Sequence, residues 1–321
     1  MSTDVLDQRL RGFHDAGVAD VLAVVDYLRE PGDTVIAGGS LTFGLGNRLS
    51  DFDVVICGAT TSKSLVPLEH WVTSLRVDVW TRSHDDIDRL FVLARDALAR
   101  PEPIAGAFGS IEQEQQLKLL HRIAFGLDLA GPPLAPVSVP DFRQVARDLV
   151  VREYAERLRE SIWVAGLAAR AGRWLAAVSN AREAVEEAFT VVLTGRGVPF
   201  TGDKWLHERL KTHAPDLRDA YRRFAALPVA AGECADYVAD ALALVGRLTG
   251  GTDESPRWSD DGLTLCKTGD THVLVAPSSG AGVELSDVDV KAWEDRDDAF
   301  CLGLYEQGLL KLLWEKGVDN R

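Results

Sequence analysis

Apolar and polar residues near the N-terminus repeat with the period of a helix. Between residues 4 and 30 the apolar positions recur every three to four residues, which predicts helical structure with one buried face. Pro31-Gly32-Asp33 ends this segment, because proline and glycine interrupt regular structure. Short β-branched and apolar runs follow and predict strands. These strands span 34–37, 51–57 and 75–80.

The segment 62–74 lies between the second and third predicted strands. We expect it to be helical, although Pro67 disfavours a helix there. A helix before the strands and another between them predict a small mixed α/β sheet in this part of the chain.

Helical periodicity dominates after residue 85, where the strand signals end. Proline-rich stretches at 101–103 and 132–136 separate successive helical segments, so the middle of the chain is expected to form a helical bundle. The predicted helices span 85–98, 110–130, 141–171, 173–195, 203–213 and 215–227.

A change of composition near residue 250 indicates a further boundary. The stretch 250–256 is rich in glycine and small polar residues and predicts a linker. Beyond it, the pattern predicts two strands followed by two helices, a winged-helix-like arrangement. These elements span 263–267, 272–276, 286–294 and 299–316. The expected fold class is therefore α+β, with a small mixed sheet, a helical bundle and a small C-terminal domain.

Composition and charge exclude several classes of protein. The 321 residues include 35 Lys and Arg against 49 Asp and Glu, a net charge of −14 that disfavours binding to a long nucleic acid. No apolar run reaches the roughly 18 residues that a membrane span needs, and no signal peptide is visible. The four cysteines are scattered without a CxxC pair, which favours a reduced, cytoplasmic protein.

Carboxylates cluster at the start of the second and third predicted strands. Asp51 and Asp53 are two residues apart, so both are expected on one face of the strand while Phe52 enters the core. Asp78 lies between two valines on the next strand. Oxygen ligands of this kind suit Mg²⁺, and three carboxylates on adjacent strands are enough to hold two ions roughly 3.5–4 Å apart. Relief of their mutual repulsion, as in Asp53→Asn, is expected to stabilise the metal-free protein.

A turn of small residues follows the first predicted strand. Gly39 and Ser40 allow backbone N–H groups and a hydroxyl to approach a polyphosphate closely. The order Gly-Gly-Ser at 38–40, ten residues, Asp51-Phe52-Asp53 and then the strand-borne Asp78 resembles the DNA polymerase β-like nucleotidyltransferase superfamily. The resemblance covers about residues 30–82, and the helical region after it is consistent with the small-molecule branch, which includes aminoglycoside nucleotidyltransferases.

The resemblance implies an enzyme that transfers a nucleoside monophosphate from an NTP, such as ATP, to a small-molecule or peptide acceptor and releases pyrophosphate. Asp51 and Asp53 would bridge two Mg²⁺ ions, Asp78 would hold the ion that activates the acceptor, and Gly39 and Ser40 would bind the triphosphate. The implied domains are a nucleotidyltransferase domain, a helical domain that closes the acceptor cleft, and an accessory domain. They span 1–110, 111–250 and 256–321.

Two alternatives to this enzyme stay open. The first is a non-catalytic module that binds a nucleotide or a protein, and the second is a protein-modifying nucleotidyltransferase of toxin–antitoxin type. The tail at 258–321 loosely resembles winged-helix peptide-recognition domains, through Leu274–Pro277, Leu285-Ser286 and Leu304–Leu310, and this implies a peptide partner. An accessory domain for packing or dimerisation explains the tail equally well.

Two further assignments concern the helical region. Lys204 follows the Gly202-Asp203 turn and either reaches the triphosphate or is a surface lysine at a helix start. The general base is either Asp78 or a glutamate among 183, 186 and 187, and those glutamates are equally explained as a solvated helix face.

Overall fold

A computed structural model describes most of the chain and divides it by compactness into two units. Unit 1 comprises Met1–Tyr154 and Leu193–Pro215, and unit 2 comprises Ala155–Val192 and Asp216–Arg321. The three-domain division expected from the sequence stays a prediction. The described residues are 2–58, 66–100, 110–134, 139–200, 203–228, 230–250, 257–259, 263–268, 271–276, 281–307 and 309–313.

Unit 1 is built on a mixed five-stranded sheet with the strand order β3-β4-β2-β1-β5. Strands β2 and β4 are parallel, and the other neighbouring pairs are antiparallel. The strands are β1 (Thr34–Gly38), β2 (Phe52–Gly58), β3 (Leu68–Val72), β4 (Leu75–Ser83) and β5 (Leu127–Ala130). This arrangement confirms the α+β class and the small mixed sheet.

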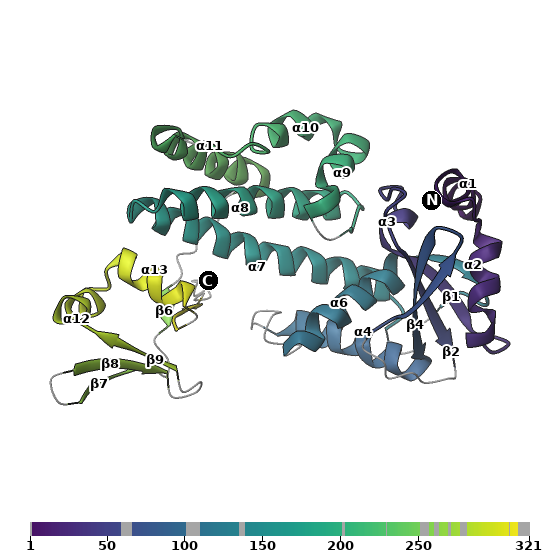
Figure 1. Cartoon of the computed structure of the whole chain (residues 1–321), viewed down its shortest axis with the longest axis horizontal. Coiled ribbons are helices and arrows are strands. Elements are labelled where there is room, and N and C mark those ends of the chain that lie inside the picture. The colour runs from purple at the N-terminus through teal and green to yellow at the C-terminus, as the bar shows by residue number, and fades with distance from the viewer. Residues whose placement is uncertain are drawn as a thin grey trace, which may run out of the picture. The chain divides into compact units, whose positions relative to one another are not determined.

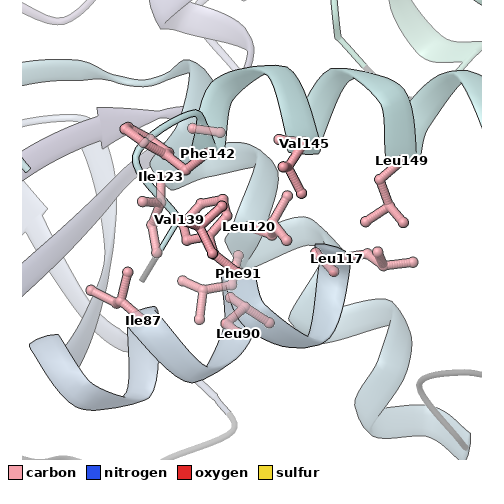
Figure 2. Packing of buried hydrophobic residues seen from close by; sticks show 14 of the residues in the cluster. Ile87, Leu90, Phe91, Leu117, Leu120, Ile123, Val139, Phe142, Val145 and Leu149 are labelled. Atoms are coloured by element: carbon pink, nitrogen blue, oxygen red, sulfur yellow. The ribbon is translucent and has the colours of Figure 1, made fainter. Parts of the chain in front are cut away.

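Helices cover both faces of this sheet (Figure 1). Helices α1 (Thr3–His14) and α2 (Val18–Val25) pack on one face, against residues such as Phe52 and Val54 of β2. Helices α4 (His84–Ala99) and α6 (Ser110–Phe125) pack on the other face, together with the start of α7 (Phe142–Arg170). Figure 2 shows this second cluster, which contains Phe91, Leu120 and Phe142. Because both faces are buried, β2 is almost continuously apolar.

Three short strands lie where the sequence predicted helix, and one of them, β10 (Lys311–Leu313), falls within the expected helix 299–316, of which α13 (Asp298–Glu306) forms only the first part. Residues 68–72, within the segment expected to be helical, form β3, which turns back at Thr73 and Ser74 to pair with β4. Residues 127–130, expected at the end of a helix, form β5 beside β1. Gly126 makes that change possible, because a Cβ there would lie 2.6 Å from the carbonyl oxygen of Ala37 on β1. Residues 59–65 and the expected linker at 251–256 lie outside the described residues.

Unit 1 also contains several short elements that connect the larger ones. Helix α3 (Gly39–Thr42) follows β1, and a 3₁₀ turn η1 (Asp26–Leu28) follows α2. Helix α8 (Trp174–Gly195), like α7, contributes to both units. A second 3₁₀ turn, η2 (Asp203–Trp205), leads into α9 (Leu206–His213).

Unit 2 contains the greater part of α8, α10 (Pro215–Arg222) and α11 (Ala231–Thr249), of which α11 had no counterpart in the sequence-based expectation. Its C-terminal part is an antiparallel meander of β7, β8 and β9, followed by α12 and α13 around a small apolar core, with β6 paired to β10. These elements are β6 (Arg257–Ser259), β7 (Thr264–Thr268), β8 (Thr271–Ala276), β9 (Ala281–Leu285), α12 (Asp287–Glu294), α13 (Asp298–Glu306) and β10 (Lys311–Leu313). Among the helices of the described ranges, none has the length and apolar character that crossing a membrane requires.

Candidate functional site

One row of residues crosses four strands of the sheet on the face that α4 and α6 cover. Gly38 on β1 lies opposite Asp53 on β2, Asp53 lies opposite Asp78 on β4, and Asp78 lies opposite Glu69 on β3. In a strand, side chains at alternate positions share a face, so Asp53 points to the same side as Val55 in the second core cluster. Three carboxylates therefore stand side by side on neighbouring strands.

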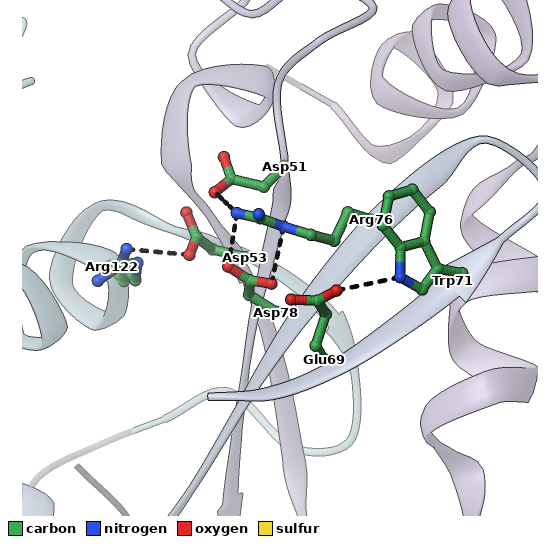
Figure 3. A network of polar contacts seen from close by, with 7 residues as sticks. All are labelled: Asp51, Asp53, Glu69, Trp71, Arg76, Asp78 and Arg122. Atoms are coloured by element: carbon green, nitrogen blue, oxygen red, sulfur yellow. Dashed lines mark hydrogen bonds and ion pairs between the residues drawn. The ribbon is translucent and has the colours of Figure 1, made fainter. Parts of the chain in front are cut away.

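Arg76 joins two of the acidic residues of this site (Figure 3). Its Nη2 atom lies 2.7 Å from Oδ2 of Asp51 and 3.2 Å from Oδ2 of Asp78, and its Nε atom lies 3.2 Å from Oδ1 of Asp78. The guanidinium group thus contacts both oxygens of Asp78 and one oxygen of Asp51. The Arg76 side chain is 41% exposed as a whole, although its Nε atom is buried.

Asp53 is paired with a different arginine. Nη2 of Arg122, on α6, lies 2.9 Å from Oδ1 of Asp53, and the two side chains are 21% and 7% exposed. The Arg122 guanidinium also lies 5.4 Å from the ring centroid of Trp80, which stabilises it through a cation–π contact. Burial raises the pKa of the Asp53 carboxyl, and the charge of Arg122 opposes that shift.

The third carboxylate shows the same balance of burial and charge. Burial raises the pKa of Asp78, while Arg76 lowers it and the nearby carboxylates of Asp51 and Asp53 raise it further. In the part of the chain that the structure describes, no group of three or more His, Cys, Asp or Glu is arranged to hold a metal ion. The metal-ligand role of Asp51, Asp53 and Asp78 therefore stays a prediction, and each of the three acids contacts an arginine here.

Gly39 lets the backbone approach Asp53. Its φ is +77°, a left-handed conformation that favours glycine, and a Cβ there would lie 2.3 Å from Oδ2 of Asp53. The sequence assigned Gly39 to phosphate binding. In the structure, its missing side chain leaves room for the carboxylate of Asp53.

We expect Gly39→Ala to destabilise the protein by about 2–3 kcal/mol, since it combines backbone strain with a clash against Asp53. Urea denaturation measures this loss. The matched control is Gly12→Ala in the interior of α1, where a Cβ meets nothing within 4 Å. That substitution should stabilise the protein by about 0.5–1 kcal/mol, because alanine favours a helix over glycine. Equal effects of the two substitutions would contradict the special role of Gly39.

A pocket of about 460 Å³ opens where β1 ends and β2 begins. It lies wholly within unit 1 and brings together residues of the sheet edge, of α6 and of the segment that precedes α9. Its lining residues are Gly39, Ser40, Phe43, Asp51, Asp53, Lys118, His121, Arg122, Phe125, Pro199, Phe200, Lys204 and Trp205.

Aromatic rings form part of the pocket wall. The rings of Phe43 and Phe200 meet edge to face with centroids 5.3 Å apart. The fully buried Arg209 holds the Phe200 segment from behind, since its Nη2 donates to the carbonyl oxygen of Val198 at 3.3 Å and its guanidinium lies 5.8 Å from the Phe200 ring. Nζ of Lys204 lies 5.4 Å from the ring centroid of Trp205.

His121 adds a neutral polar group to the pocket. Burial, helped by the charge of Arg122, lowers the pKa of His121 to about 4, so its imidazole is uncharged at neutral pH. The charged groups that line the pocket are therefore two carboxylates on the sheet side and the cations of Lys118, Arg122 and Lys204.

The pocket contains five of the six residues proposed from the sequence. These are Gly39, Ser40, Asp51, Asp53 and Lys204. The sixth, Asp78, does not line the pocket but is joined to Asp51 through Arg76.

Sequence reasoning missed Glu69, Arg76, Lys118 and Arg122. The position of Arg76, two residues before Asp78 on one strand, could have been predicted from the alternation of side chains in that strand. Lys118 and Arg122 had no local signal, since only the packing of α6 on the sheet brings them to the pocket.

Comparison with known proteins adds little to this geometry. No protein-family model matches the chain, and no curated protein sequence matches it. Among solved structures, the chain is similar to a nucleotidyltransferase-like protein from Exiguobacterium sibiricum 255-15. The alignment covers 98% of this chain and 96% of that chain, with 10% sequence identity and a TM-score of 0.36. So low a TM-score supports no argument about fold or function, so functional inference rests on the site itself.

Proposed function

We propose that this chain is a Mg²⁺-dependent nucleotidyltransferase that transfers a nucleoside monophosphate from an NTP to a small-molecule or peptide acceptor and releases pyrophosphate. The observation that carries the proposal is the composition of one pocket. Asp51 and Asp53 line it beside Lys118 and Lys204, and aromatic rings such as Phe200 complete its wall. Carboxylates suit a metal ion, lysines suit phosphates, and flat rings suit a base.

The chemistry of the donor atoms suits Mg²⁺, although, among the described residues, their present arrangement around the arginines does not form a metal site. Asp51, Asp53 and Asp78 offer only oxygen atoms, the ligands that Mg²⁺ prefers. Oδ1 of Asp53 is buried and, within the described residues, accepts no hydrogen bond, its ion-pair contact with Arg122 aside. A buried charge of this kind gains from a further cation. Two ions held by these carboxylates would neutralise phosphate charge and make the acceptor hydroxyl more acidic.

The residues of the chain would divide the remaining tasks. Lys118 and Lys204 would bind the phosphates and hold the α-phosphorus in reach of the acceptor, since positioning and charge neutralisation account for most of the catalysis of such transfers. The acceptor oxygen bonds to the α-phosphorus as the bond to the bridging oxygen breaks. Asp78, which Arg76 joins to Asp51, would take the acceptor proton, a role that the burial-raised pKa of its carboxyl favours.

A non-catalytic nucleotide-binding module is the second candidate. One observation favours it: Arg76 bridges Asp51 and Asp78, and Arg122 pairs with Asp53, so each of the three acids has a cationic partner from the chain itself. A protein of this kind would bind the nucleotide through the same lysines and rings and leave it intact.

Incubation with each α-labelled NTP tests the two candidates. The reaction contains Mg²⁺ and a pool of hydroxyl-bearing small molecules and peptides, and both pyrophosphate and the label are followed. Transfer of label that EDTA abolishes supports the enzyme, and the labelled species separates a small-molecule acceptor from a peptide or from the chain itself. Nucleotide binding by equilibrium dialysis, without pyrophosphate release from any NTP, supports the second candidate instead.

Reversal of the charge of Lys204 should weaken nucleotide binding. Lys204→Glu places a carboxylate in the pocket near Asp51 and Asp53, so we expect the KM for NTP to rise by about tenfold or more while kcat changes less. The matched control is Lys211→Glu on α9, an exposed lysine outside the pocket lining. An unchanged KM in Lys204→Glu would assign Lys204 to the protein surface.

A further inference from the structure

The two arginines of the site are held to different degrees. Arg122 is packed tightly, because its Cβ and Cγ would lie 2.9 Å from a Cβ added to Gly38, and its guanidinium stacks on Trp80. Arg76 lies at the solvated edge with a side chain that is 41% exposed, about twice the 21% of Arg122. Exposed ion pairs contribute little to stability, so the contacts of Arg76 can be exchanged at low cost.

The guanidinium of Arg76 sits where a cation bound by Asp51 and Asp78 would sit. It contacts three of their four carboxylate oxygens at 2.7–3.2 Å. Two like charges this close to one another need a positive charge between them, and Arg76 supplies one. An ion that binds these carboxylates must therefore displace Arg76.

Trp71, on the neighbouring strand, offers Arg76 a second position. Trp71 on β3 is directly opposite Arg76 on β4, and residues opposite each other on antiparallel strands have Cβ atoms about 5 Å apart. The Trp71 residue is 60% exposed, and its indole N–H donates to Glu69 at 3.1 Å. Figure 3 shows Glu69 and Trp71 on the Arg76 side of the site. The face of an exposed indole attracts a cation such as a guanidinium group.

We infer that Arg76 competes with a divalent cation for the carboxylates of Asp51 and Asp78. Arg76 occupies the cation position in the metal-free protein and moves onto Trp71 when the ion binds. The inference rests on the proposed function, because it assumes that these carboxylates bind metal. It would let the metal-free protein keep its acidic site folded without an ion.

This competition raises the apparent Kd for the ion by an amount that can be measured. When the binding-competent state is only a fraction of the population, the apparent Kd is the intrinsic Kd divided by that fraction. If Arg76 occupies the site about nine-tenths of the time, its removal lowers the apparent Kd for the ion about tenfold.

Mn²⁺ binding to the full chain, followed by the electron paramagnetic resonance signal of the free ion, tests the inference without any turnover. Arg76→Gln leaves a shorter polar side chain and removes the charge, and we expect it to bind Mn²⁺ about tenfold more tightly than the unmodified chain. Arg76→Lys keeps the charge without the forked guanidinium, and its affinity should lie between the two. Arg89→Gln, at an exposed arginine of α4 paired with Asp86, is the matched control and should leave Mn²⁺ affinity unchanged.

The outcomes separate this inference from the proposed function. Equal Mn²⁺ affinity in Arg76→Gln and the unmodified chain overturns the competition and leaves the metal-dependent function standing. Absence of Mn²⁺ binding in every variant, with folding verified by urea denaturation, overturns both.

Tryptophan fluorescence tests the movement itself. Addition of Mg²⁺ should change the emission of the unmodified chain, and the change should be lost in Trp71→Phe and in Arg76→Gln. Metal binding with an emission change that persists in Trp71→Phe overturns the movement onto Trp71.

Discussion

Replacement of Asp53 by asparagine is expected to reduce nucleotidyl transfer by about a thousandfold or more, since it removes the most buried of the three carboxylates that would hold the ions. Asparagine keeps the shape of the side chain, so the pocket and its lysines should still bind the nucleotide. We expect kcat to fall much more than the affinity for NTP, measured separately by equilibrium dialysis.

The matched control is Asp85→Asn in the first turn of α4, where the carboxylate is exposed and outside the pocket lining. It should retain nearly full activity. Substantial activity in Asp53→Asn would refute the assignment of Asp53 as a metal ligand.

The structure also changes the stability that we expect for Asp53→Asn. From the sequence, relief of repulsion among Asp51, Asp53 and Asp78 favoured a more stable metal-free protein. The structure places Arg122 against Asp53, so the substitution instead leaves a largely buried guanidinium without its counter-charge. We therefore expect Asp53→Asn to lower the free energy of unfolding in EDTA, by about 1–3 kcal/mol, because the asparagine oxygen can still accept a hydrogen bond.

The strands that the sequence predicted are the three inner ones. Residues of β1 and β2 form apolar runs because helices cover both sides of the sheet, and the first part of β4 alternates buried apolar residues with polar ones. Strand β3 is at the edge, carries exposed residues such as Leu68 and Trp71, and follows Pro67, so its composition gave no clear period. The two-residue turn at Thr73-Ser74 joins β3 to β4, but it lacks the glycine, asparagine or aspartate that marks such hairpins in a sequence.

The acidic residues could be predicted because their arrangement is local. Asp51 and Asp53 share a face through the period of a strand, and the spacing from Gly39 carries the family resemblance. Their partners could not be predicted in the same way. Glu69 joins the row only through the β3–β4 register, and Arg122 arrives from a helix far along the chain. Register and helix packing are tertiary properties, which no short window of sequence contains.

Loss of the ion pair between Arg122 and Asp53 is expected to lower the stability of the protein strongly. Arg122→Met keeps most of the apolar stem beside Gly38 but removes the charge, and it leaves the Asp53 carboxylate buried without its partner. Removal of one partner of a buried pair costs about 3–5 kcal/mol, so we expect a loss of this size at pH 7.5, measured by urea denaturation in EDTA. Arg89→Met, at an arginine that is 70% exposed, should cost less than about 1 kcal/mol.

The pH dependence of that loss identifies its cause. Burial already raises the pKa of Asp53 in the folded protein, and the charge of Arg122 holds it down, so in Arg122→Met the folded pKa rises further above the unfolded value. Between those two values the folded protein binds more protons than the unfolded chain, and stability therefore falls as the pH rises through the folded pKa. The destabilisation by Arg122→Met should be largest at pH 7.5 and smaller at pH 5. A loss that is equally large at both pH values would show that Arg122 stabilises the fold through packing on Gly38 and Trp80 rather than through the charge of Asp53.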